Sequence, residues 1–339
     1  MALVPVLLLA LFFSLSVIGN AQPKVPAIYV FGDSTADVGN NNYLPGAGKV
    51  NFLPYGIDFP DSIPTGRWTN GYNFVDFFAR QMGFQMSPPP YLSLPNNTSQ
   101  VGVNYASGGS GILDSTGNHT LTMTKQIKYF AATNKSNIVL SKCIFLISAG
   151  ANDIIALLAK NTASSITQPE QFYNNLISNY TKQIEALYNL GARKFGIVDV
   201  GPIGCTPGAR LLFNHSGACF DAVNVLVRVV NDDVKVMLSN LSSTLKGMKY
   251  SLGSAYAAVS NMIANPEAAG FKDVTSGCCG GSSVECTPTT IYCKNRTEYL
   301  FWDAIHPTQR AYEEAVLDIY SGSPPFVTPI NFKQLVEDA

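Results

Sequence analysis

Five short runs of apolar residues recur along the chain after residue 21. They are AIYVF at 27–31, VGVNYA at 101–106, CIFLISA at 143–149, FGIVDV at 195–200 and YSLGSAY at 250–256. Their hydrophobic residues are consecutive rather than alternating with polar ones, which is typical of strands buried on both faces of a parallel sheet. The pattern therefore predicts a five-stranded parallel sheet.

In two longer segments, hydrophobic residues recur at steps of three and four, which is the helical period. Over 172–190 the positions are Phe172, Leu176, Tyr180, Ile184, Leu187 and Tyr188, and over 220–241 they are Phe220, Val223, Val227, Val230, Val234, Met237 and Leu241. Gly191 follows the first segment, as glycine often follows a helix. Strands that alternate with such helices predict an α/β fold in which helices cover the sheet.

The segment between the first two predicted strands is long and rich in proline, glycine and aromatic residues. A connection of this length usually has a function or contains a helix of its own, and residues 72–82 show a helical pattern. Its aromatic residues Phe52, Tyr55, Phe59 and Trp68 either line a groove for an acyl chain or anchor the segment to the core. We favour the second interpretation.

Residues 1–21 contain no charged side chain and end in the small-residue sequence Gly19-Asn20-Ala21. This pattern predicts a secretory signal peptide that is cleaved near Ala21. A membrane anchor is the alternative, because the apolar run approaches the length that spans a bilayer. The remaining residues, 22–339, contain no linker that would separate two domains, so we expect a single domain there.

The chain has a high density of Asn-x-Ser/Thr sequences, which suits an N-glycosylated extracellular protein. They begin at Asn96, Asn97, Asn118, Asn134, Asn179, Asn214, Asn240 and Asn295. In an extracellular protein the cysteines of the C-terminal half are expected to form disulfides, whose pairing the sequence leaves open. A zinc site at Cys279, Cys286 and Cys293 is a less favoured alternative, since no histidine lies nearby. Cys143 lies in an apolar run and is expected to be a buried free thiol.

Positive and negative side chains nearly balance, with 22 Lys and Arg against 23 Asp and Glu, and neither sign forms a block. Proteins that bind nucleic acid or anionic membranes usually present a basic patch. We therefore expect neither nucleic acid nor a stably bound membrane as a partner. A neutral or weakly charged small molecule fits better, and no residue pattern calls for a cofactor or a metal ion.

Polar residues and glycines directly follow three of the predicted strands. Ser34 follows the first strand, Ser107-Gly108-Gly109-Ser110-Gly111 follows the second, and Asn152-Asp153 comes soon after the third. Functional groups in an open parallel sheet collect beyond the carboxyl ends of its strands. We therefore expect these residues to face one crevice.

Ser34 needs a base before its hydroxyl can act as a nucleophile, and histidine is the usual base near neutral pH. His119 and His215 lie inside glycosylation sequences, which indicates exposed loops. His306 remains, and Asp303 precedes it by three residues. A turn at this spacing sets the carboxylate against the imidazole Nδ1, where it fixes the tautomer and stabilises the imidazolium.

Taken in order, these motifs resemble those of the plant GDSL esterase/lipase family of SGNH hydrolases. The similarity comprises FGDSTADVGNNN at 31–42, YGIDFP with PTGRWTNG at 55–71, VNYASGGSGILD at 103–114, SAGANDI at 148–154, DVGPIGCTP at 199–207, and CCG at 278–280 through FWDAIHPT at 301–308. The resemblance implies a three-layer α/β/α sandwich of flavodoxin-like type. It also implies a secreted, extracellular enzyme of the apoplast or cell wall.

By this resemblance, Ser34 is the nucleophile, His306 its base and Asp303 the partner of the histidine. The resemblance also implies an oxyanion hole made of the Ser34 backbone N–H, a glycine N–H from the second motif and the Asn152 side-chain amide. Such donors stabilise the negative oxygen of the tetrahedral intermediate. The alternative role of Asn152 is that of an Asx or N-cap residue of the helix that follows, and the two roles are compatible.

Gly109 and Gly111 are both candidates for the glycine of the oxyanion hole, and we prefer Gly111; the alternative role for either is a tight turn with positive φ. Thr35 stands where the family has leucine after the serine. We expect position 35 to contribute packing rather than a proton or a donor, so that the chemistry is retained.

The function implied is hydrolysis of carboxylic esters through a covalent acyl-enzyme. An acyltransferase that uses the same three residues, with a sugar or lipid hydroxyl as acceptor, is one alternative. A non-catalytic secreted binding protein on a hydrolase scaffold is the other, because a fold does not guarantee an activity. Lipid, cell-wall acetyl and secondary-metabolite esters are all compatible with the family, and no residue selects among them.

Overall fold

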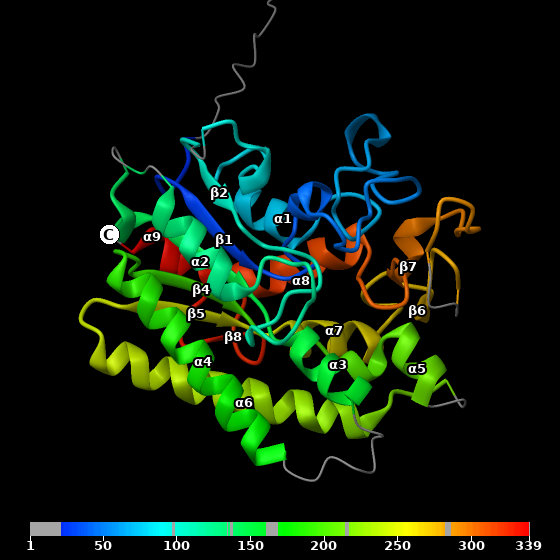
Figure 1. Cartoon of the computed structure of the whole chain (residues 1–339). Helices are drawn as coiled ribbons and strands as arrows, with labels where there is room; N and C mark the ends of the chain where they lie inside the picture. Colours follow the sequence, from blue (N-terminus) through cyan, green and yellow to red (C-terminus); the bar gives the residue numbers. More distant parts are fainter. Residues whose placement is uncertain are drawn as a thin grey trace, which may run out of the picture.

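A six-stranded sheet forms the centre of the structure, a computed structural model that describes residues 22–96, 99–133, 135, 138–160, 169–213, 217–281 and 286–338. The strands are β1 (Ile28–Gly32), β2 (Gly102–Asn104), β3 (Ile144–Ser148), β4 (Lys194–Val198), β5 (Lys249–Gly253) and β8 (Val327–Thr328). Their order in space is β2-β1-β3-β4-β5-β8 (Figure 1). The first five strands are parallel, as predicted, and β8 is antiparallel to β5.

The order of the five parallel strands is that of doubly wound, flavodoxin-like sheets, in which ligands bind beyond the carboxyl ends of the strands. β1 pairs with β3 from Ile28 opposite Ile144 to Gly32 opposite Ser148. These two central strands therefore end at the same level, and the residues that follow them lie side by side. The sequence pattern does not predict β8, because two residues are too few to show a period.

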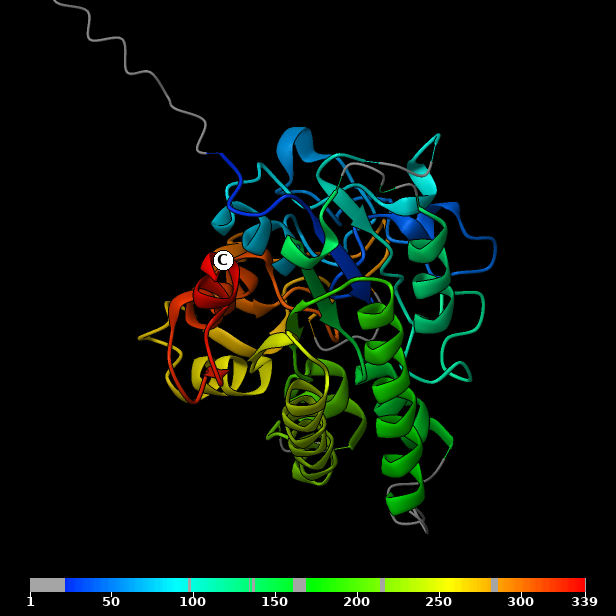
Figure 2. The same cartoon turned by 90° about the vertical axis from the view of Figure 1, so that its left-hand side faces the viewer.

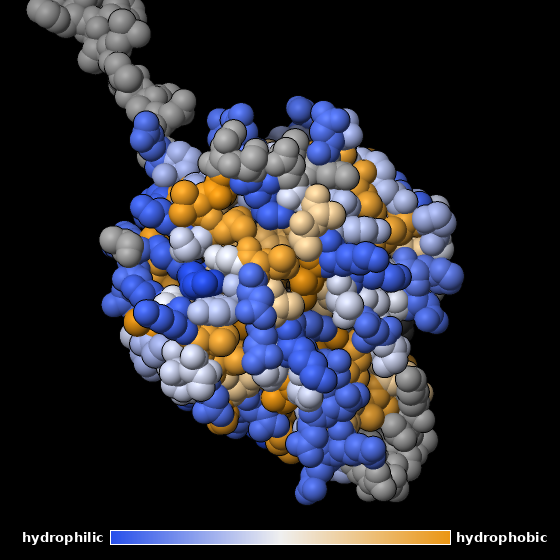
Figure 3. Space-filling model, turned by 60° about the vertical axis from the view of Figure 1, so that its left-hand side comes forward, coloured by the Kyte–Doolittle hydropathy of each residue, from blue (hydrophilic) through white to orange (hydrophobic). Residues whose placement is uncertain are grey.

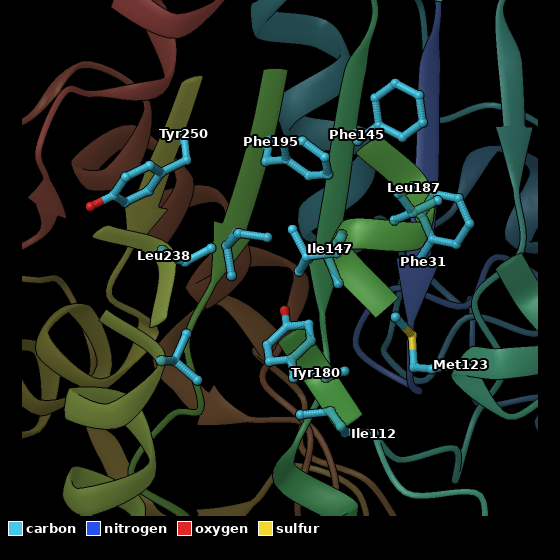
Figure 4. Close-up of a cluster of buried hydrophobic side chains, with 14 of the residues drawn as sticks. Phe31, Ile112, Met123, Phe145, Ile147, Tyr180, Leu187, Phe195, Leu238 and Tyr250 are labelled. Atoms are coloured by element: carbon cyan, nitrogen blue, oxygen red, sulfur yellow. The ribbon is translucent and has the colours of Figure 1, made fainter. Parts of the chain in front are cut away.

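Helices cover both faces of the sheet and produce the three layers that the resemblance implies (Figures 1 and 2). Helices α2 (Met123–Ala132), α4 (Pro169–Asn189) and α6 (Asp221–Thr244) pack on one face. Figure 4 shows this layer, with Phe31, Phe145 and Phe195 of the strands and with Tyr180 and Leu187 of α4. Helices α1 (Phe74–Gln81), α8 (Gln309–Ser321) and α9 (Phe332–Glu337) pack on the other face.

The hydrophobic patterns of the sequence correspond to these packing faces. The α4 residues Leu176, Tyr180, Ile184 and Leu187 are fully buried, and the predicted positions of α6 from Val223 to Leu241 are buried as well. Successive residues of a strand point to opposite faces, so a strand covered on both sides must be apolar throughout.

The predicted helix within 72–82 is also confirmed. It is α1, which begins after Asn73, where the Asn73 side chain accepts hydrogen bonds from the backbone N–H groups of Val75 and Asp76. The α1 side chains Phe74 and Phe78 are buried against the sheet and against α8 and α9.

Three further helices come after parallel strands, beyond the carboxyl ends of these strands. Helix α3 (Ala151–Lys160) follows β3, α5 (Pro207–Phe213) comes after β4, and α7 (Ala255–Ala264) follows β5. A separate two-stranded parallel sheet consists of β6 (Asp273–Gly277) and β7 (Tyr299–Phe301). Short 3-10 segments occur at Asn40–Tyr43, Pro60–Ser62, Tyr91–Ser93, Leu140–Lys142, Ile203–Cys205 and Arg296–Glu298. The sequence pattern does not predict the small sheet, because β6 is mostly polar and β7 is only three residues long.

Six cysteines form three disulfides. The pairs are Cys205–Cys219, Cys278–Cys293 and Cys279–Cys286. The zinc alternative is therefore wrong, since all three of its proposed ligands are in disulfides. Cys143 is a buried free thiol, as expected.

The predicted signal peptide, 1–21, lies outside the described residues, as do Asn97, Asn134 and Asn214. The other glycosylation sequences begin at exposed asparagines, except for the half-buried Asn179 in α4. Among the described residues, no helix has both the length and the apolar composition needed to cross a bilayer. On the face seen in Figure 3, hydrophobic and hydrophilic residues are interspersed.

Candidate active site

Ser34 lies two residues beyond the end of β1, at the carboxyl edge of the sheet. Gly32 ends the strand with φ +139°, and a Cβ atom there would collide with the carbonyl oxygen of Ser148 on β3. Only glycine lets the two strands approach this closely where the chain turns. The Asp33 N–H then donates to the same Ser148 oxygen over 3.1 Å, and the Ser34 side chain remains half-buried.

His306 and Asp303 reach Ser34 from the far end of the chain. The His306 Nε2 lies 2.8 Å from the Ser34 Oγ, and its Nδ1 lies 2.8 Å from the Asp303 Oδ2. Ser34, His306 and Asp303 therefore form a continuous chain of hydrogen bonds across 272 positions of sequence. Both residues lie in the turn between β7 of the small sheet, which ends at Phe301, and α8, which begins at Gln309.

The turn between β7 and α8 is fixed by Asp303 itself. Its Oδ1 accepts hydrogen bonds from the backbone N–H groups of Ile305 over 2.8 Å and His306 over 2.7 Å. Burial raises the pKa of Asp303, but the interaction with His306 and these backbone donors outweigh burial, so the pKa lies below its usual value. The carboxylate therefore stays ionised near neutral pH and lies where it can accept a hydrogen bond from the His306 Nδ1.

Tyr55 adds a fourth member to this chain of hydrogen bonds. Its hydroxyl donates to the Asp303 Oδ2 over 2.7 Å. Burial, followed by the negative charge of Asp303, raises the pKa of Tyr55 above its usual value, so the phenol remains a donor. Both oxygens of the buried carboxylate are thus occupied, which fixes the plane of the carboxyl group against His306.

Trp68 packs on the histidine from the same long segment. The indole and imidazole rings are 5.2 Å apart at 38°, and Tyr55 contacts Trp68 edge-on at 6.3 Å. The buried ion pair of Arg67 with Asp76, with an Nε–Oδ2 distance of 2.7 Å, anchors this part of the segment to α1.

Three of the four aromatic residues, Phe52, Tyr55 and Trp68, pack in an apolar cluster with Trp302 and disulfide cysteines, as favoured, whereas Phe59 contacts residues of its own segment. Tyr55 and Trp68 also contact the catalytic candidates. Phe52 packs on Tyr55, and Phe59 packs on Tyr72. The contacts of Tyr55 and Trp68 with Asp303 and His306 have no signal in the sequence, because they depend on the irregular path of the segment.

The second glycine-rich motif lies beside the first in a network of buried polar groups. The Gly108 N–H donates to the Asp37 Oδ2 over 2.9 Å, and the Ser110 Oγ donates to the Gly32 carbonyl over 2.8 Å. Asp153 accepts from the Ile112 N–H over 2.8 Å. The next two donors to Asp153 are the Leu113 N–H at 3.1 Å and the Thr116 hydroxyl at 2.7 Å. Asp153 therefore connects the 107–116 loop to the first turn of α3.

Asn152 lies in that first turn, since α3 begins at Ala151. The helix-cap role is therefore wrong for Asn152, which lies inside the helix and not before it. Its Nδ2 donates to the Ser110 carbonyl oxygen over 2.9 Å, so the amide is directed toward the glycine-rich loop. Within the described part of the chain the second amide proton of Asn152 has no acceptor, so it can bind a ligand.

A side chain is unfavourable at both candidate glycines, but for different reasons. Gly109 has φ +86°, which fits the turn role, whereas a Cβ on Gly111 would lie 2.5 Å from the Asp153 Oδ1. Within the described residues, the backbone N–H groups of Ser34, Gly109 and Gly111 have no hydrogen-bond acceptor. Backbone donors that lack a partner in a folded protein are suited to bind a ligand oxygen.

Thr35 contributes more than packing, which corrects our expectation for this position. Its backbone N–H and its hydroxyl both donate to the Asp33 Oδ1, at 3.0 and 2.8 Å, and its Oγ1 lies 3.1 Å from the Ser148 Oγ. None of these bonds reaches His306 or Asp303. Burial raises the pKa of Asp33 to about 6, although the Thr35 donors partly offset this rise.

The structure brings the predicted site residues to one edge of the sheet. Ser34, Gly111, Asn152, Asp303 and His306 come from four segments that follow β1, β2, β3 and β7. His119 is exposed, as expected, and His215 lies outside the described residues. In the described part of the chain, no cluster of three or more His, Cys, Asp or Glu side chains is arranged to hold a metal ion.

Comparison with known proteins gives consistent matches over most of the chain. The sequence model of the family described as GDSL-like Lipase/Acylhydrolase matches residues 28–319. A GDSL esterase/lipase of Arabidopsis thaliana is 35% identical over 97% of this chain and 95% of its own length. GDSL esterase/lipase 7 of the same organism is 36% identical over 93% of both chains. A solved lipolytic G-D-S-L family protein from Veillonella parvula covers 85% of this chain and 92% of its own, at 15% identity and a TM-score of 0.38.

Proposed function

Because the chain belongs to the GDSL-like lipase/acylhydrolase family, we propose that it is a secreted serine esterase that acts through Ser34, His306 and Asp303. The observation that carries this proposal is the 2.8 Å contact of the Ser34 Oγ with the His306 Nε2. A general base must lie within hydrogen-bond reach of the proton that it removes. The family supports ester hydrolysis, and this contact supports the choice of nucleophile.

In the first half of the reaction, the Ser34 Oγ attacks the carbonyl carbon of the ester while the His306 Nε2 takes its proton. Asp303 holds the imidazole through Nδ1 and stabilises the imidazolium. The tetrahedral intermediate then breaks its bond to the alkoxy oxygen, which leaves as an alcohol with the proton from His306. In the second half, His306 takes a proton from the water molecule that attacks the acyl-serine, and it transfers this proton to the Ser34 Oγ as the carboxylic acid leaves.

The negative oxygen of the tetrahedral intermediate needs donors that are already in place. We assign this role to the backbone N–H of Ser34, the backbone N–H of Gly111 and the Nδ2 amide of Asn152, with Gly109 as the alternative glycine. The two backbone groups have no acceptor among the described residues, and one such donor typically contributes about 100- to 1000-fold in rate. A neutral amide at position 152 donates at any pH at which the enzyme is folded.

The first prediction concerns Ser34→Ala. We expect this variant to lose hydrolysis of p-nitrophenyl acetate by at least about 1000-fold, since the nucleophile is absent. The wild-type protein is expected to react covalently with a fluorophosphonate probe, and the variant is not. Thermal unfolding of both proteins shows whether the substitution leaves the fold intact. Equal hydrolysis by wild type and variant would contradict the assignment of Ser34.

The same experiment separates the two alternatives. If an added alcohol or sugar converts the acyl product wholly into a new ester, the protein is an acyltransferase. If Ser34 reacts with neither ester nor probe, the protein is a binding protein on a hydrolase scaffold.

The proposed secretion and glycosylation predict a mature N-terminus near Gln22 and a loss of mass after enzymatic removal of N-glycans.

A further inference from the structure

The Trp68 indole packs on the ring of His306, the general base of the proposed reaction. The two ring centroids are 5.2 Å apart, and the ring planes are inclined at 38°. A cation is attracted to an aromatic ring when it lies within about 6 Å of the centroid, and tryptophan attracts cations most strongly. The His306 ring is neutral before it takes the Ser34 proton and is a cation afterwards. The contact with the indole is therefore stronger after proton transfer than before it.

Two glycines and Tyr55 hold the indole in this position. A Cβ atom on Gly108 would lie 2.5 Å from the Trp68 Nε1, and a Cβ atom on Gly48 would lie 3.2 Å from the Trp68 Cη2. Neither glycine has a positive φ, so the indole, rather than the backbone conformation, excludes a side chain at both positions. Tyr55 contacts the indole edge-on at 6.3 Å. We call the space between these three residues and His306 the indole slot.

Asn41 connects the two glycine walls of the indole slot. Its Nδ2 donates to the Gly48 carbonyl over 3.0 Å and to the Gly108 carbonyl over 2.9 Å. Its Oδ1 accepts from the Ser107 hydroxyl over 2.5 Å. Asn41 is 1% exposed, and a buried amide with these partners restricts the motion of both backbone segments. The indole slot is therefore preorganised.

The indole N–H indicates that the ring of Trp68, and not its polar atom, is what this position uses. Among the described residues, the Trp68 Nε1 is buried and has no hydrogen-bond partner. A buried donor without an acceptor destabilises the folded state, and a phenylalanine at this position would avoid that cost. A tryptophan here is thus explained by its ring, which contacts His306, and not by a hydrogen bond.

We propose that Trp68 is a positioning residue of the reaction: it holds the His306 ring toward Ser34 and stabilises the imidazolium that forms when the ring takes the hydroxyl proton. The inference rests on the proposed function. Two acidic groups also face the imidazolium, namely Asp303, 2.8 Å from its Nδ1, and Asp33, which attracts it electrostatically. Both groups are present in every variant below, so a change in the stability of the imidazolium can be assigned to the indole.

Trp68→Leu removes the aromatic ring and leaves an apolar side chain in the indole slot. With p-nitrophenyl acetate we expect kcat to fall by roughly tenfold with little change in KM, because the contact gains strength only during proton transfer. The acid limb of the pH–rate profile is expected to move to lower pH by about half a unit, since a less stabilised imidazolium loses its proton more readily. Steady-state kinetics from about pH 4 to 9 measures both effects.

Trp68→Phe and Phe59→Leu are the matched variants. Trp68→Phe keeps an aromatic ring next to His306, so it is expected to retain the acid limb of the wild type and kcat within about threefold. Phe59 is half-buried, as is Trp68, and belongs to the same long segment. Its ring contacts Tyr72 and Arg67. Phe59→Leu is therefore expected to leave both kcat and the acid limb unchanged.

Gly108→Ala disturbs the same contact from the wall of the indole slot. The three atoms nearest to its added Cβ all belong to Trp68, so the indole must move relative to His306. We expect the acid limb to move to lower pH, as in Trp68→Leu. In the Trp68→Leu background, Gly108→Ala has no indole to displace and is expected to cause no further change, because residues in direct contact give non-additive effects. Gly108→Ala alone decides the question if Trp68→Leu does not fold.

The outcomes distinguish this inference from the proposed function. Active wild-type enzyme together with a variant of Trp68→Leu or Gly108→Ala whose acid limb stays in place would overturn the role of Trp68 and leave the esterase intact. If the wild-type protein hydrolyses no ester, the contact is tested by nuclear magnetic resonance titration of the His306 ring in wild type and Trp68→Leu. A transition that moves to lower pH by about half a unit in the variant supports the inference, and an unchanged transition overturns it.

Discussion

At the scale of single residues, hydrogen bonds connect Tyr55 through Asp303 and His306 to Ser34. Ser34, Asp303 and His306 are candidates because serine, histidine and aspartate form a known chemical set, and Asp303 is close to His306 in sequence. Tyr55 and Trp68 give no such signal, since aromatic residues in an irregular segment have many possible contacts. The structure shows that the Tyr55 hydroxyl and the Trp68 ring support the carboxylate and the imidazole, respectively.

Tyr55→Phe tests this support. A hydrogen bond to a charged group typically contributes about 1.5 kcal/mol or more, so we expect kcat/KM to fall by roughly tenfold. Without the phenol the Asp303 carboxylate holds its proton more strongly, so the acid limb of the pH–rate profile is expected to move to higher pH. Both effects are measured with one short-chain p-nitrophenyl ester from pH 4 to 9.

Tyr43→Phe is the matched control, because Tyr43 is 55% exposed and lies outside the site. It is expected to retain the wild-type profile. A Tyr55→Phe enzyme with a lower rate but an unchanged pH profile would show that Tyr55 acts through packing alone.

At the scale of elements, three connections hold the site in place. The turn between β7 and α8 carries Asp303 and His306, the 107–116 loop carries the candidate glycines, and the start of α3 carries Asn152. Hydrophobic periodicity predicts α1, α4, α6 and the long strands, because their apolar residues face a continuous core. The small sheet gives no such pattern, since β6 is mostly polar and β7 is too short to show a period, although Leu300 and Phe301 of β7 are buried.

Asp153→Ala tests the connection between the 107–116 loop and α3. The substitution leaves the N–H groups of Ile112 and Leu113 and the Thr116 hydroxyl without their acceptor. We expect kcat to fall by about 100-fold with a smaller change in KM, because loss of one oxyanion donor costs about this much. Steady-state kinetics at the pH optimum measures the effect.

Asp114→Ala is the control for this variant, since Asp114 is an exposed residue of the same loop. It is expected to behave as wild type. If Asp153→Ala kept a normal kcat while its Tm fell, Asp153 would contribute only to stability.

At the scale of the whole molecule, the contact between Ser34 and His306 requires that two segments 272 positions apart in the sequence lie side by side. The strand pattern predicts that Ser34 lies at the carboxyl edge of a parallel sheet, and the structure confirms the sheet. The pattern does not predict the apolar cavity between the sheet and α8, because its wall collects side chains from β4, α7 and α8 whose distances depend on helix packing. Local periodicity contains no information on such distances.

Buried carboxyl groups predict how the stability of the fold depends on pH. Burial raises the pKa of Asp33 and Asp37 to about 6 and that of Asp199 to about 7, above the value of 3.8 for the unfolded chain. Between about pH 4 and 7 the folded state therefore binds more protons, and the free energy of unfolding falls as the pH rises. We expect Tm to be higher at pH 5 than at pH 8 in differential scanning calorimetry.

Asp199→Asn checks the contribution of one group. The slope of the free energy of unfolding against pH is expected to become less steep by up to about 1.4 kcal/mol per pH unit between pH 4 and 7. Asp61→Asn, at an exposed position, should retain the wild-type slope. A protein whose Tm rises steadily from pH 5 to pH 8 would contradict the prediction.

The buried Cys143 gives the protein a built-in reporter of its own unfolding. It is the single cysteine outside the three disulfides, is fully buried next to β3, and burial raises its pKa to about 12. A maleimide reacts with thiolate and therefore labels only molecules in which the centre of the sheet has opened. The rate of labelling thus counts opening events under native conditions, without denaturant and without an introduced tag.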